Sequence, residues 1–522
     1  MKIAVGDLKI RKEWLLAGIF ALGIFVRFFL LGVIPPGLNQ DEASIGYDAW
    51  AMLHYGIDRN GFHNPIHLVS WGSGQNALYA YLSMPFIRLL GLNVFSVRFL
   101  NALMGSLSLF LFYDLMKNLT NKDIGTIALF LLAISPWHIM MSRWGLESNI
   151  FPGFVLLGTW LLVRALRQKF LLPLAFFVFA LSLYAYGTAY FFVPVFLFCV
   201  LFYLLRHDKV KIKTLLLGST VFILVAIPVF LFVFINLRSL DSITTSFFSI
   251  PRLIAPRFGE VSSLFSKNAF TESLINFRDL LDLLFLTQHD GLIWNGIPAY
   301  GYLFLFSPPF LLFGFLHTLR NRKIWTQFSP LFFLVIWFLV AVFLGIVTRV
   351  NVNRVNAVFL PAIGLVTVGI SFLREHARTF FRYLMLCYFL FFLSFLYSYF
   401  FVYPINAGPA FFESLGEAIQ YALKVAPPES TMHITDTVNM PYVFVLFYER
   451  TDPRKFLQSV TYVNPEAPFR AVQSFGRYHF GIRKDNLQDD VYIFHNSEAP
   501  LFENGAFTVH PFRYYSVAIR NE

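Results

Sequence analysis

The sequence predicts a polytopic α-helical membrane protein of about 11 transmembrane helices, followed by a small C-terminal extracytoplasmic α/β domain. Of the 522 residues, 57% are hydrophobic and only 14% are charged, and the mean hydropathy is +0.61. A soluble core cannot absorb that much apolar surface, so most of it must face lipid. Two further observations carry the prediction: short basic loops separate the apolar runs, and the composition becomes ordinarily polar after Tyr403.

Crossing the hydrocarbon layer takes about 20 apolar residues in a helix. The first candidate run, 14–34, is longer than a signal-peptide core, and Pro35-Pro36-Gly37 follows it in place of a small-residue cleavage site. We therefore expect a retained signal anchor. The runs that we expect to span are 14–34, 94–116, 123–141, 150–167, 170–187, 189–206, 214–237, 299–319, 329–348, 354–373 and 380–402.

Loop charge predicts the orientation. Every second loop between these runs is basic, whereas the alternating loops carry acids, aromatic residues and scattered arginines. Basic loops stay in the cytoplasm, so we expect a cytoplasmic N terminus, an extracytoplasmic C terminus and insertion in the plasma (inner) membrane. The basic residues of the predicted inner loops include Lys9, Arg11, Lys12, Lys117, Lys122, Arg164, Lys169, Arg206, Lys211, Arg320, Arg322, Lys323, Arg374 and Arg378.

We expect two domains. Residues 1–402 form the transmembrane domain, with two long outer loops, 35–93 and 238–298; loops of this length are usually functional or ordered. Residues 403–522 form the extracytoplasmic domain. In it "FESLGEAIQYALKVAPPES" and "NMPYVFVLFYERTDP" predict helices, and "TMHITDT", "YHFGI", "DVYIFHN" and "YYSVAIRN" predict strands.

Several classes of function are disfavoured. The net charge is +11, but the basic residues are spread over short loops and are not gathered on one soluble face, so no nucleic-acid partner is expected. The two cysteines, Cys199 and Cys387, lie inside apolar runs without a CxxC motif. Neither a disulfide framework nor a zinc site is therefore predicted, no cofactor is expected, and a divalent metal requirement is left open.

Four stretches, in order, resemble the C-type-fold membrane glycosyltransferases, the clan of protein O-mannosyltransferases and bacterial aminoarabinose transferases. They are "LNQDEASIGYDAWAMLHYGIDRNG", "GLNVFSVRFLNALMGSLSLFLFYDLMK", "AISPWHIMMSRWGLESNIFPGFVLLG" and "RVNVNRVNAVFLPAIGL". The resemblance covers roughly 35–370. It implies an enzyme that uses a lipid-phosphate-linked sugar on the outer membrane face, with Asp41 at the position of the catalytic base. Glu147 departs from the Asp that many members carry in the second outer loop.

The adjacent acids Asp41 and Glu42 allow two interpretations. Acidic residues favour helix N termini, so the pair could simply cap a helix that starts at Ala43. Alternatively, a carboxylate beside apolar walls has a raised pKa and suits general-base catalysis. The resemblance favours the second interpretation for Asp41. Glu42 would then orient the base or contact the acceptor.

Glu147 is a supporting catalytic candidate. It lies at helical spacing from Arg143, which also predicts a plain surface ion pair. Trp137, His138 and Trp144 crowd the same short loop, where aromatic rings could stack on a sugar or belong to the interfacial belt. Arg143 itself suits a phosphate contact, because a guanidinium binds phosphate with two parallel hydrogen bonds.

The remaining substrate-binding candidates are Arg98, Arg349, Arg354, His289 and Tyr47. Fixed cations would stabilise the charge that grows on a lipid phosphate as the glycosidic bond breaks. Arg349 and Arg354 flank "VNVN", and Arg98 enters a span. His289 with Asp290 could contact substrate or a divalent ion, although an ordinary loop feature is the simpler interpretation. Arg27, inside the first run, is expected to snorkel to the outer surface.

Taken alone, the residues predict a polar outer-face cavity, and the resemblance supplies the reaction. We expect an inverting glycosyltransferase that moves a sugar from a polyprenyl-phosphate-linked donor in the membrane to an extracytoplasmic acceptor of unknown class. The alternative is a polytopic lipid or solute transporter or flippase. A transporter should place ionisable residues near the bilayer midplane and show inverted repeats, and the sequence shows no such repeat.

Overall fold

The computed structural model describes residues 2–256, 262–321, 326–483, 487–503 and 505–521. Residues 257–261 of the predicted outer loop, and Arg322 and Lys323 of a predicted inner loop, lie outside them. The chain divides into two compact units. The first, the helical unit, comprises Met1–Phe29, Asn101–Ile227 and Phe258–Phe401. The second, which we call the outer unit after the predicted outer loops that it contains, comprises Leu30–Leu100, Pro228–Arg257 and Val402–Glu522.

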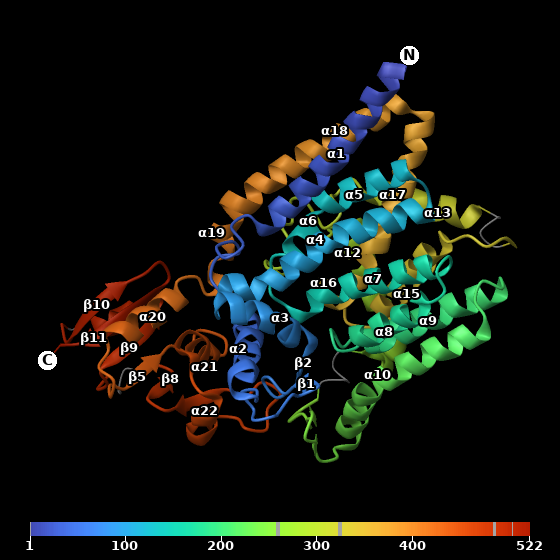
Figure 1. The fold of residues 1–522 in the computed structure, drawn as a ribbon. Coiled ribbons are helices and arrows are strands. Elements are labelled where there is room, and N and C mark those ends of the chain that lie inside the picture. The colour runs from blue at the N-terminus through green and yellow to red at the C-terminus, as the bar shows by residue number, and fades with distance from the viewer. Residues whose placement is uncertain (1, 257–261, 322–325, 484–486, 504, 522) are drawn as a thin grey trace. The chain divides into compact units, whose positions relative to one another are not determined.

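The helical unit holds most of the apolar helices (Figure 1). Two long helices, α4 (Val94–Leu119) and α10 (Ile212–Arg238), begin in one unit and end in the other along the chain. The other helices are α1 (Lys2–Phe28), α5 (Lys122–Ile134), α6 (Pro136–Met141), α7 (Phe151–Ala165), α8 (Leu171–Ser182), α9 (Ala189–Arg206), α12 (Ala269–Phe285), α13 (Pro308–Arg320), α15 (Phe332–Val347), α16 (Val352–Val355), α17 (Phe359–His376) and α18 (Arg378–Tyr397).

Within the described part of the chain, six helices are long and apolar enough to cross a membrane. They confirm a polytopic helical chain, while the predicted count of eleven is met only in part. Three shorter apolar helices, Leu78–Leu90, Leu171–Ser182 and Phe332–Val347, add to them. The six are Val94–Leu119, Glu147–Ala165, Ala189–Arg206, Ile212–Arg238, Val352–His376 and Arg378–Ala407.

Two predicted spans were wrong in their helical extent. The run 123–141 is broken into α5 and α6 at Ser135, whose hydroxyl accepts from the His138 N–H at 3.4 Å. Pro136 then opens α6, because proline lacks the N–H that an unbroken helix would need there.

In the run 299–319 the helix begins only at Pro308, and the preceding residues form turns. The Gln288 side chain replaces helical hydrogen bonds there. Its Nε2 donates to the Phe304 carbonyl at 3.2 Å, and its Oε1 accepts from the Leu303 N–H at 2.9 Å. The buried backbone is thus satisfied without a helix.

Glycines set the close packing of α13 against α17. A Cβ atom at Gly314 would overlap the Leu365 carbonyl oxygen, and one at Gly369 would overlap the Phe310 carbonyl oxygen. Small residues at a helix interface let the two backbones approach, which strengthens packing where no hydrophobic effect drives association.

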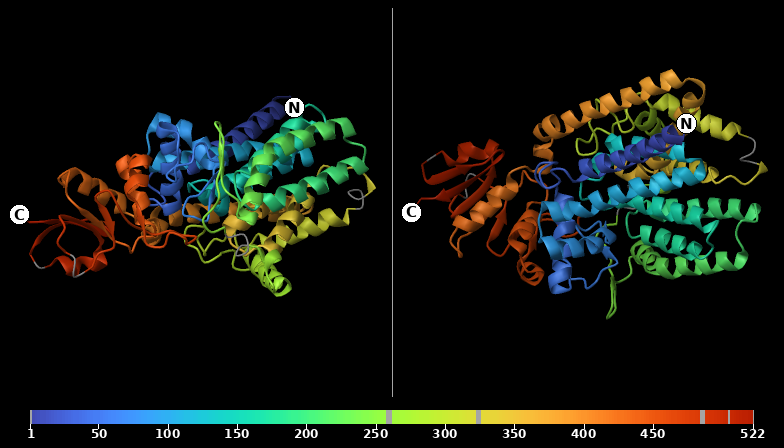
Figure 2. Two further views of the ribbon diagram at one scale, coloured as in Figure 1. Left: turned by 90° about the horizontal axis from the view of Figure 1, so that it is seen from below. Right: turned by 45° about the horizontal axis from the view of Figure 1, so that its top comes forward.

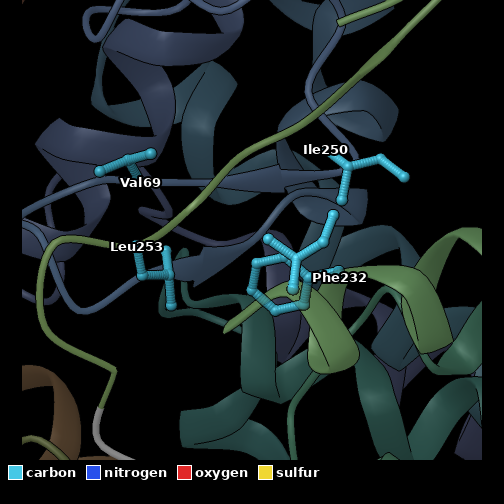
Figure 3. Packing of buried hydrophobic residues seen from close by; sticks show 5 residues of the cluster. Val69, Phe232, Ile250 and Leu253 are labelled. Carbon is cyan, nitrogen blue, oxygen red and sulfur yellow. The ribbon is translucent and has the colours of Figure 1, made fainter. Parts of the chain in front are cut away.

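The outer unit joins the first predicted outer loop and the beginning of the second, up to Arg257, to the tail. Its first part holds α2 (Gln40–Tyr55), α3 (Leu78–Leu90) and the two-stranded pairs β1 (His67–Leu68) with β2 (Gln75–Asn76) and β3 (Ile243–Thr244) with β4 (Ser249–Ile250). An apolar cluster packs the two loops together (Figure 3). Its buried members are Val69, Phe232, Ile235, Ile250 and Leu253.

The tail forms the predicted α/β arrangement around a seven-stranded mixed sheet of order β10-β11-β9-β5-β8-β7-β6 (Figure 1 and Figure 2). Helix α20 (Leu415–Val425) packs on β9 and β11 and ends before Pro427. Predicted strands became β5 (Met432–Ile434), β8 (Tyr478–Phe480), β9 (Val491–His495) and β11 (Tyr515–Arg520), and the second predicted helix became α21 (Pro441–Val445). The sequence did not predict β6 (Thr461–Tyr462), β7 (Val472–Phe475), β10 (Phe507–Pro511) or α22 (Pro453–Ser459).

Replacing Gly314 or Gly369 by Ala should lower stability, because the new methyl group must push α13 and α17 apart. Overpacking of this kind costs about 1–3 kcal/mol. Thermal unfolding in detergent, followed by a thiol-reactive dye or by aggregation, measures the effect. Gly18→Ala is the matched control, since nothing lies within 4 Å of its added Cβ. Equal unfolding temperatures for all three variants would contradict the close approach.

Candidate active site

Helix α2 begins with a capping box that involves only one of the two adjacent acids. The Asn39 side chain accepts from the Asp41 N–H at 3.0 Å, and Glu42 Oε2 accepts from the Asn39 N–H at 3.1 Å. This satisfies backbone donors that a helix start leaves open. At the other end Gly56 adopts a left-handed conformation, φ 75°, and closes the helix. The helix begins at Gln40 with Asn39 as its N-cap, so the expected start at Ala43 was wrong and both acids lie in the first turn. Of the two, Glu42 takes part in the capping box, and the carboxyl of Asp41 is left for other contacts.

Glu42 also forms a buried ion pair with Arg98. The guanidinium Nε and Nη2 lie 2.7 and 2.8 Å from the two carboxylate oxygens, and both side chains are 0% exposed. Arg98 further donates to the carbonyls of Pro35 at 2.7 Å and Gly37 at 2.9 Å. The nitrogens of Arg98 hold the chain that leads into α2, and its predicted contact with substrate stays a prediction.

Asp41 lies on a different side of α2 and keeps part of its surface exposed. Its carboxyl accepts a side-chain hydrogen bond from Trp71 and feels the nearby charges of Glu42 and Arg59. Burial by its surroundings raises the pKa of Asp41 to about 6; the Trp71 hydrogen bond and Arg59 lower the pKa, and Glu42 raises it. A carboxyl with a pKa in this range can both hold and release a proton near neutral pH.

Arg59, the cation beside Asp41, was not among the predicted site residues. Its side chain is 1% exposed, and its guanidinium lies 4.6 Å from the centre of the Trp71 ring. Nη2 donates to the hydroxyls of Ser44 at 2.6 Å and Ser70 at 2.9 Å. Nε and Nη1 have no hydrogen-bond partner among the described residues. The guanidinium therefore keeps donors available for a further polar group.

Two buried acids balance Arg59. Asp48 lies 3.8 Å from Arg59 Nη2 and accepts the Arg59 N–H at 3.1 Å. Asp58 accepts the N–H groups of Asn60 and Phe62, each at 2.9 Å. Burial, followed by the charge of Asp48, raises the pKa of Asp58 to about 7, and burial also raises the pKa of Asp48. The Gly-Xaa-Asp-Arg sequence in "HYGIDRNG" was the available signal for this cluster.

Tyr47 is fully buried, and its hydroxyl donates to the Thr451 carbonyl at 2.6 Å. Its ring lies 5.8 Å from that of Trp50 on the same helix. This geometry favours a structural role in fastening α2 to the tail over the predicted substrate contact.

In the helical unit, Arg143 and Glu147 are both buried, at 0% and 8% exposure, so the predicted surface location of this pair was wrong. Arg143 Nη1 donates to the carbonyls of Val26 at 2.7 Å and Arg27 at 3.1 Å. Its guanidinium also lies 5.4 Å from the ring centre of Tyr399. Glu147 opens the short helix η1 (Glu147–Ile150). Burial of these residues in a membrane protein requires that each charge be compensated.

Arg27 is also fully buried, and it does not snorkel. Its guanidinium donates to the carbonyls of Gly23 at 2.7 Å and Leu132 at 3.1 Å and contacts His138 Nδ1 at 2.5 Å. Backbone carbonyls close to the arginine give its donors partners inside the protein, so the side chain need not reach water.

His289 and Asp290 organise the loop that carries them. The two ring nitrogens of His289 contact the Gly296 carbonyl at 3.2 Å and the Gly291 N–H at 2.9 Å. Asp290 Oδ2 accepts from the Val352 N–H at 3.0 Å, which ties this loop to the turn containing Arg349 and Arg354. The geometry favours the loop-feature interpretation of His289. No group of three or more His, Cys, Asp or Glu residues suited to a metal ion occurs among the described residues.

The "VNVN" turn places its two arginines differently. Arg349 is exposed and Arg354 is half-buried. Arg354 Nη1 lies 3.4 Å from the Arg349 carbonyl, and the Arg354 N–H donates to the Asn351 side chain at 2.9 Å. Both guanidinium groups reach the surface of the helical unit, in contrast to the buried Arg143.

Comparisons with solved structures match nearly the whole chain. Cupriavidus metallidurans ArnT in the apo state is 12% identical, with 98% of each chain covered and a TM-score of 0.55. ArnT bound to undecaprenyl phosphate matches at 12% identity over 96% of this chain and 97% of that chain, with a TM-score of 0.52. The chain has the fold of the C-type membrane glycosyltransferases. The C-type fold predicted from the four motifs is thereby confirmed.

Another solved structure, a family model and a curated protein also match parts of the chain. Archaeoglobus fulgidus oligosaccharyltransferase tethered with an acceptor peptide is 12% identical, with 98% of this chain and 74% of that chain covered and a TM-score of 0.51. The family model for dolichyl-phosphate-mannose-protein mannosyltransferase matches residues 76–232. YkcB of Bacillus subtilis (strain 168), named as a mannosyltransferase, is 34% identical over 144 residues. That match spans 26% of this chain and 19% of YkcB.

Breaking the Glu42–Arg98 pair should destabilise the fold strongly. Glu42→Ala leaves a buried guanidinium without its carboxylate, and loss of one partner of a buried pair costs about 3–5 kcal/mol. Asp241→Asn is the control, because its ion pair with Arg252 is exposed and 4.0 Å long; near-wild-type stability is expected there. Denaturant or thermal unfolding in detergent measures both variants. If Glu42→Ala unfolds at the same midpoint as Asp241→Asn, the pair does not hold α2.

Proposed function

We propose that this protein is an inverting membrane glycosyltransferase that moves a sugar from a polyprenyl-phosphate donor to an extracytoplasmic acceptor. The observation that carries the proposal is Asp41: a partly accessible carboxyl with a pKa raised to about 6, hydrogen-bonded by Trp71 and close to the buried cation Arg59. The C-type fold and the similarity to ArnT bound to undecaprenyl phosphate support the donor class. The mannosyltransferase family model over 76–232 supports the reaction class.

In this proposal Asp41 is the general base. Its ionised carboxylate takes the proton of the acceptor hydroxyl as the hydroxyl oxygen attacks the anomeric carbon. The bond between that carbon and the phosphate oxygen breaks on the opposite side, and its electron pair leaves with the lipid phosphate. The new glycosidic bond has the inverted configuration. A base with a pKa near 6 is ionised at pH 7 and still accepts a proton readily in the transition state.

Charge compensation for the leaving phosphate is assigned to arginines. Arg59 lies in the same unit as Asp41 and has donors without described partners. In the helical unit, Arg349 and Arg354, which are not buried, stay predicted substrate-binding residues, and Glu147 stays a predicted supporting carboxylate. A guanidinium suits this task because it stays charged and offers parallel donors to phosphate oxygens.

The proposed orientation places the N terminus in the cytoplasm and the outer unit on the extracytoplasmic side of the plasma (inner) membrane. The predicted inner loops are basic, which supports this orientation. The donor lipid would enter from the bilayer, and the acceptor would approach from the extracytoplasmic side.

Asp41→Asn should strongly slow sugar transfer while the protein still inserts and folds. The amide cannot accept the acceptor proton, and loss of a general base lowers the rate by about 10²–10⁴-fold. The assay uses proteoliposomes with a panel of undecaprenyl-phosphate hexoses and pentoses and extracted envelope material as acceptor. Wild-type activity should fall as the pH drops below about 6, because Asp41 then becomes protonated.

Asp241→Asn is the matched control for the same chemical change at an exposed outer-loop acid, and it should keep wild-type transfer. Unchanged transfer by Asp41→Asn would reject Asp41 as the base. Movement of labelled lipid across the bilayer without any transfer would reject the glycosyltransferase and favour a flippase.

A further inference from the structure

The loop that carries Trp71 has an irregular backbone with few hydrogen bonds of its own. In "SWGSG", Ser70, Gly72 and Gly74 all have positive φ, at 52°, 133° and 93°. Within the loop, the Gly72 and Gly74 N–H groups both donate to the Val69 carbonyl, at 2.9 and 3.2 Å. Glycine adopts positive φ without strain, whereas for Ser70 this conformation is unfavourable and persists where the surrounding structure fixes it. The position of the Trp71 indole therefore depends on what contacts this loop from outside.

One side of the loop is held by the second outer loop. Val69 is buried in the apolar cluster beside Leu253 (Figure 3). The Gly72 carbonyl accepts from the N–H groups of Ile254 at 2.9 Å and Ala255 at 3.2 Å. These contacts fix the two ends of the loop and leave the Trp71 carbonyl for another partner.

The tail supplies that partner through Arg470. Its backbone N–H and its Nε both donate to the Trp71 carbonyl, at 3.1 and 3.3 Å. Its Nη2 donates to Asn60 Oδ1 at 2.7 Å, and Asn60 Nδ2 donates in turn to the Ser70 carbonyl at 3.4 Å. One guanidinium thus holds two consecutive carbonyls of the loop, one directly and one through Asn60.

Two further contacts show that the tail closely covers this loop. Gly72 forms an antiparallel bridge with Phe469, and a Cβ atom at Gly72 would lie 2.9 Å from the Ala467 carbonyl oxygen. The Arg470 guanidinium itself is fixed over the Tyr462 ring at 4.5 Å. The backbone next to Arg470 and the guanidinium at the end of its side chain are therefore both held in place. This suits a residue that fixes the position of another residue.

We propose that Arg470 is a positioning residue: the tail completes the candidate active site by fixing the Trp71 loop so that the indole N–H reaches Asp41. This inference rests on the proposed function. The indole donates to the ionised carboxylate and so favours the charged form of the base. The tail then acts on the reaction through Arg470, Trp71 and Asp41 in sequence, without Arg470 touching a substrate.

The test is the pH dependence of transfer in Arg470→Lys and Trp71→Phe. Lysine keeps the charge and the backbone N–H bond to the Trp71 carbonyl. Its single ammonium nitrogen cannot replace both guanidinium nitrogens, of which Nε bonds the Trp71 carbonyl and Nη2 bonds Asn60. Loss of the indole hydrogen bond raises the pKa of Asp41, and a base with a higher pKa stays protonated to a higher pH. The acid limb of the profile should therefore move upward by up to about one pH unit in each variant.

The double variant should show the same shift as either single variant, because both changes remove the same hydrogen bond. Arg477→Lys is the matched control: Arg477 also donates to two backbone carbonyls of the tail, those of Pro427 at 3.0 Å and Pro428 at 2.9 Å, but none of its hydrogen bonds reaches the Trp71 loop. It should leave the acid limb in place. A wild-type acid limb in Arg470→Lys, or an equal shift in Arg477→Lys, would overturn the inference while the proposed function stands.

Hydrogen exchange separates this inference from failure of the proposed function. Arg470→Lys should speed exchange in the peptide that contains Gly72 and Gly74, and Arg477→Lys should not. If wild-type protein transfers no sugar from any donor but the exchange difference is present, the proposed function fails and the fixing of the loop by Arg470 stands. Equal exchange in both variants would overturn that fixing whatever the activity.

Discussion

The candidate site depends on one constraint: a buried charge must be compensated where it lies. Glu42 and Arg98 are both fully buried, and each is the other's partner at 2.7 Å. Because the same arginine also binds the carbonyls of Pro35 and Gly37, it fixes the point at which α2 begins. Successive residues of a helix are rotated by about 100°. With Glu42 turned toward Arg98, its neighbour Asp41 must face another direction, where it meets Trp71.

The surroundings of Asp41 balance opposing effects on its protonation. Burial and the charge of Glu42 favour the neutral form, while the Trp71 hydrogen bond and Arg59 favour the ionised form. Had Asp41 been paired directly, as Glu42 is, its carboxylate would be a poor base, because a salt bridge lowers the pKa. The two adjacent acids thus have different environments: Glu42 is held in a buried ion pair, and Asp41 can bind and release a proton. Sequence adjacency is what makes that difference possible on a helix.

The sequence allowed prediction of those elements that a local pattern of residues determines. The helix after the acid pair, the long apolar helices and some of the tail elements carry short-range signals, and these were predicted; β6, β7, β10 and α22 of the tail were not. The break at Ser135 and the turns before Pro308 were missed because apolar content alone does not show where proline or a Gln288 side chain ends a helix. Arg59 was missed for a different reason. Its importance depends on a loop that returns to α2, and a spacing of 18 residues along the chain, from Asp41 to Arg59, gives no sign of that return.

The tail illustrates the same limit at longer range. We predicted it as a separate domain, whereas the structure groups it with Leu30–Leu100 and Pro228–Arg257 in one compact unit. The hydrogen bond from Arg470 to Trp71 joins residues 399 apart in sequence. The entropy lost on closing a loop grows only slowly with loop length, so doubling the length adds little to the cost. A contact between residues this far apart can therefore form once the intervening helices are inserted. Because Trp71 lies between Arg470 and Asp41, the tail and the proposed base are linked through a single side chain.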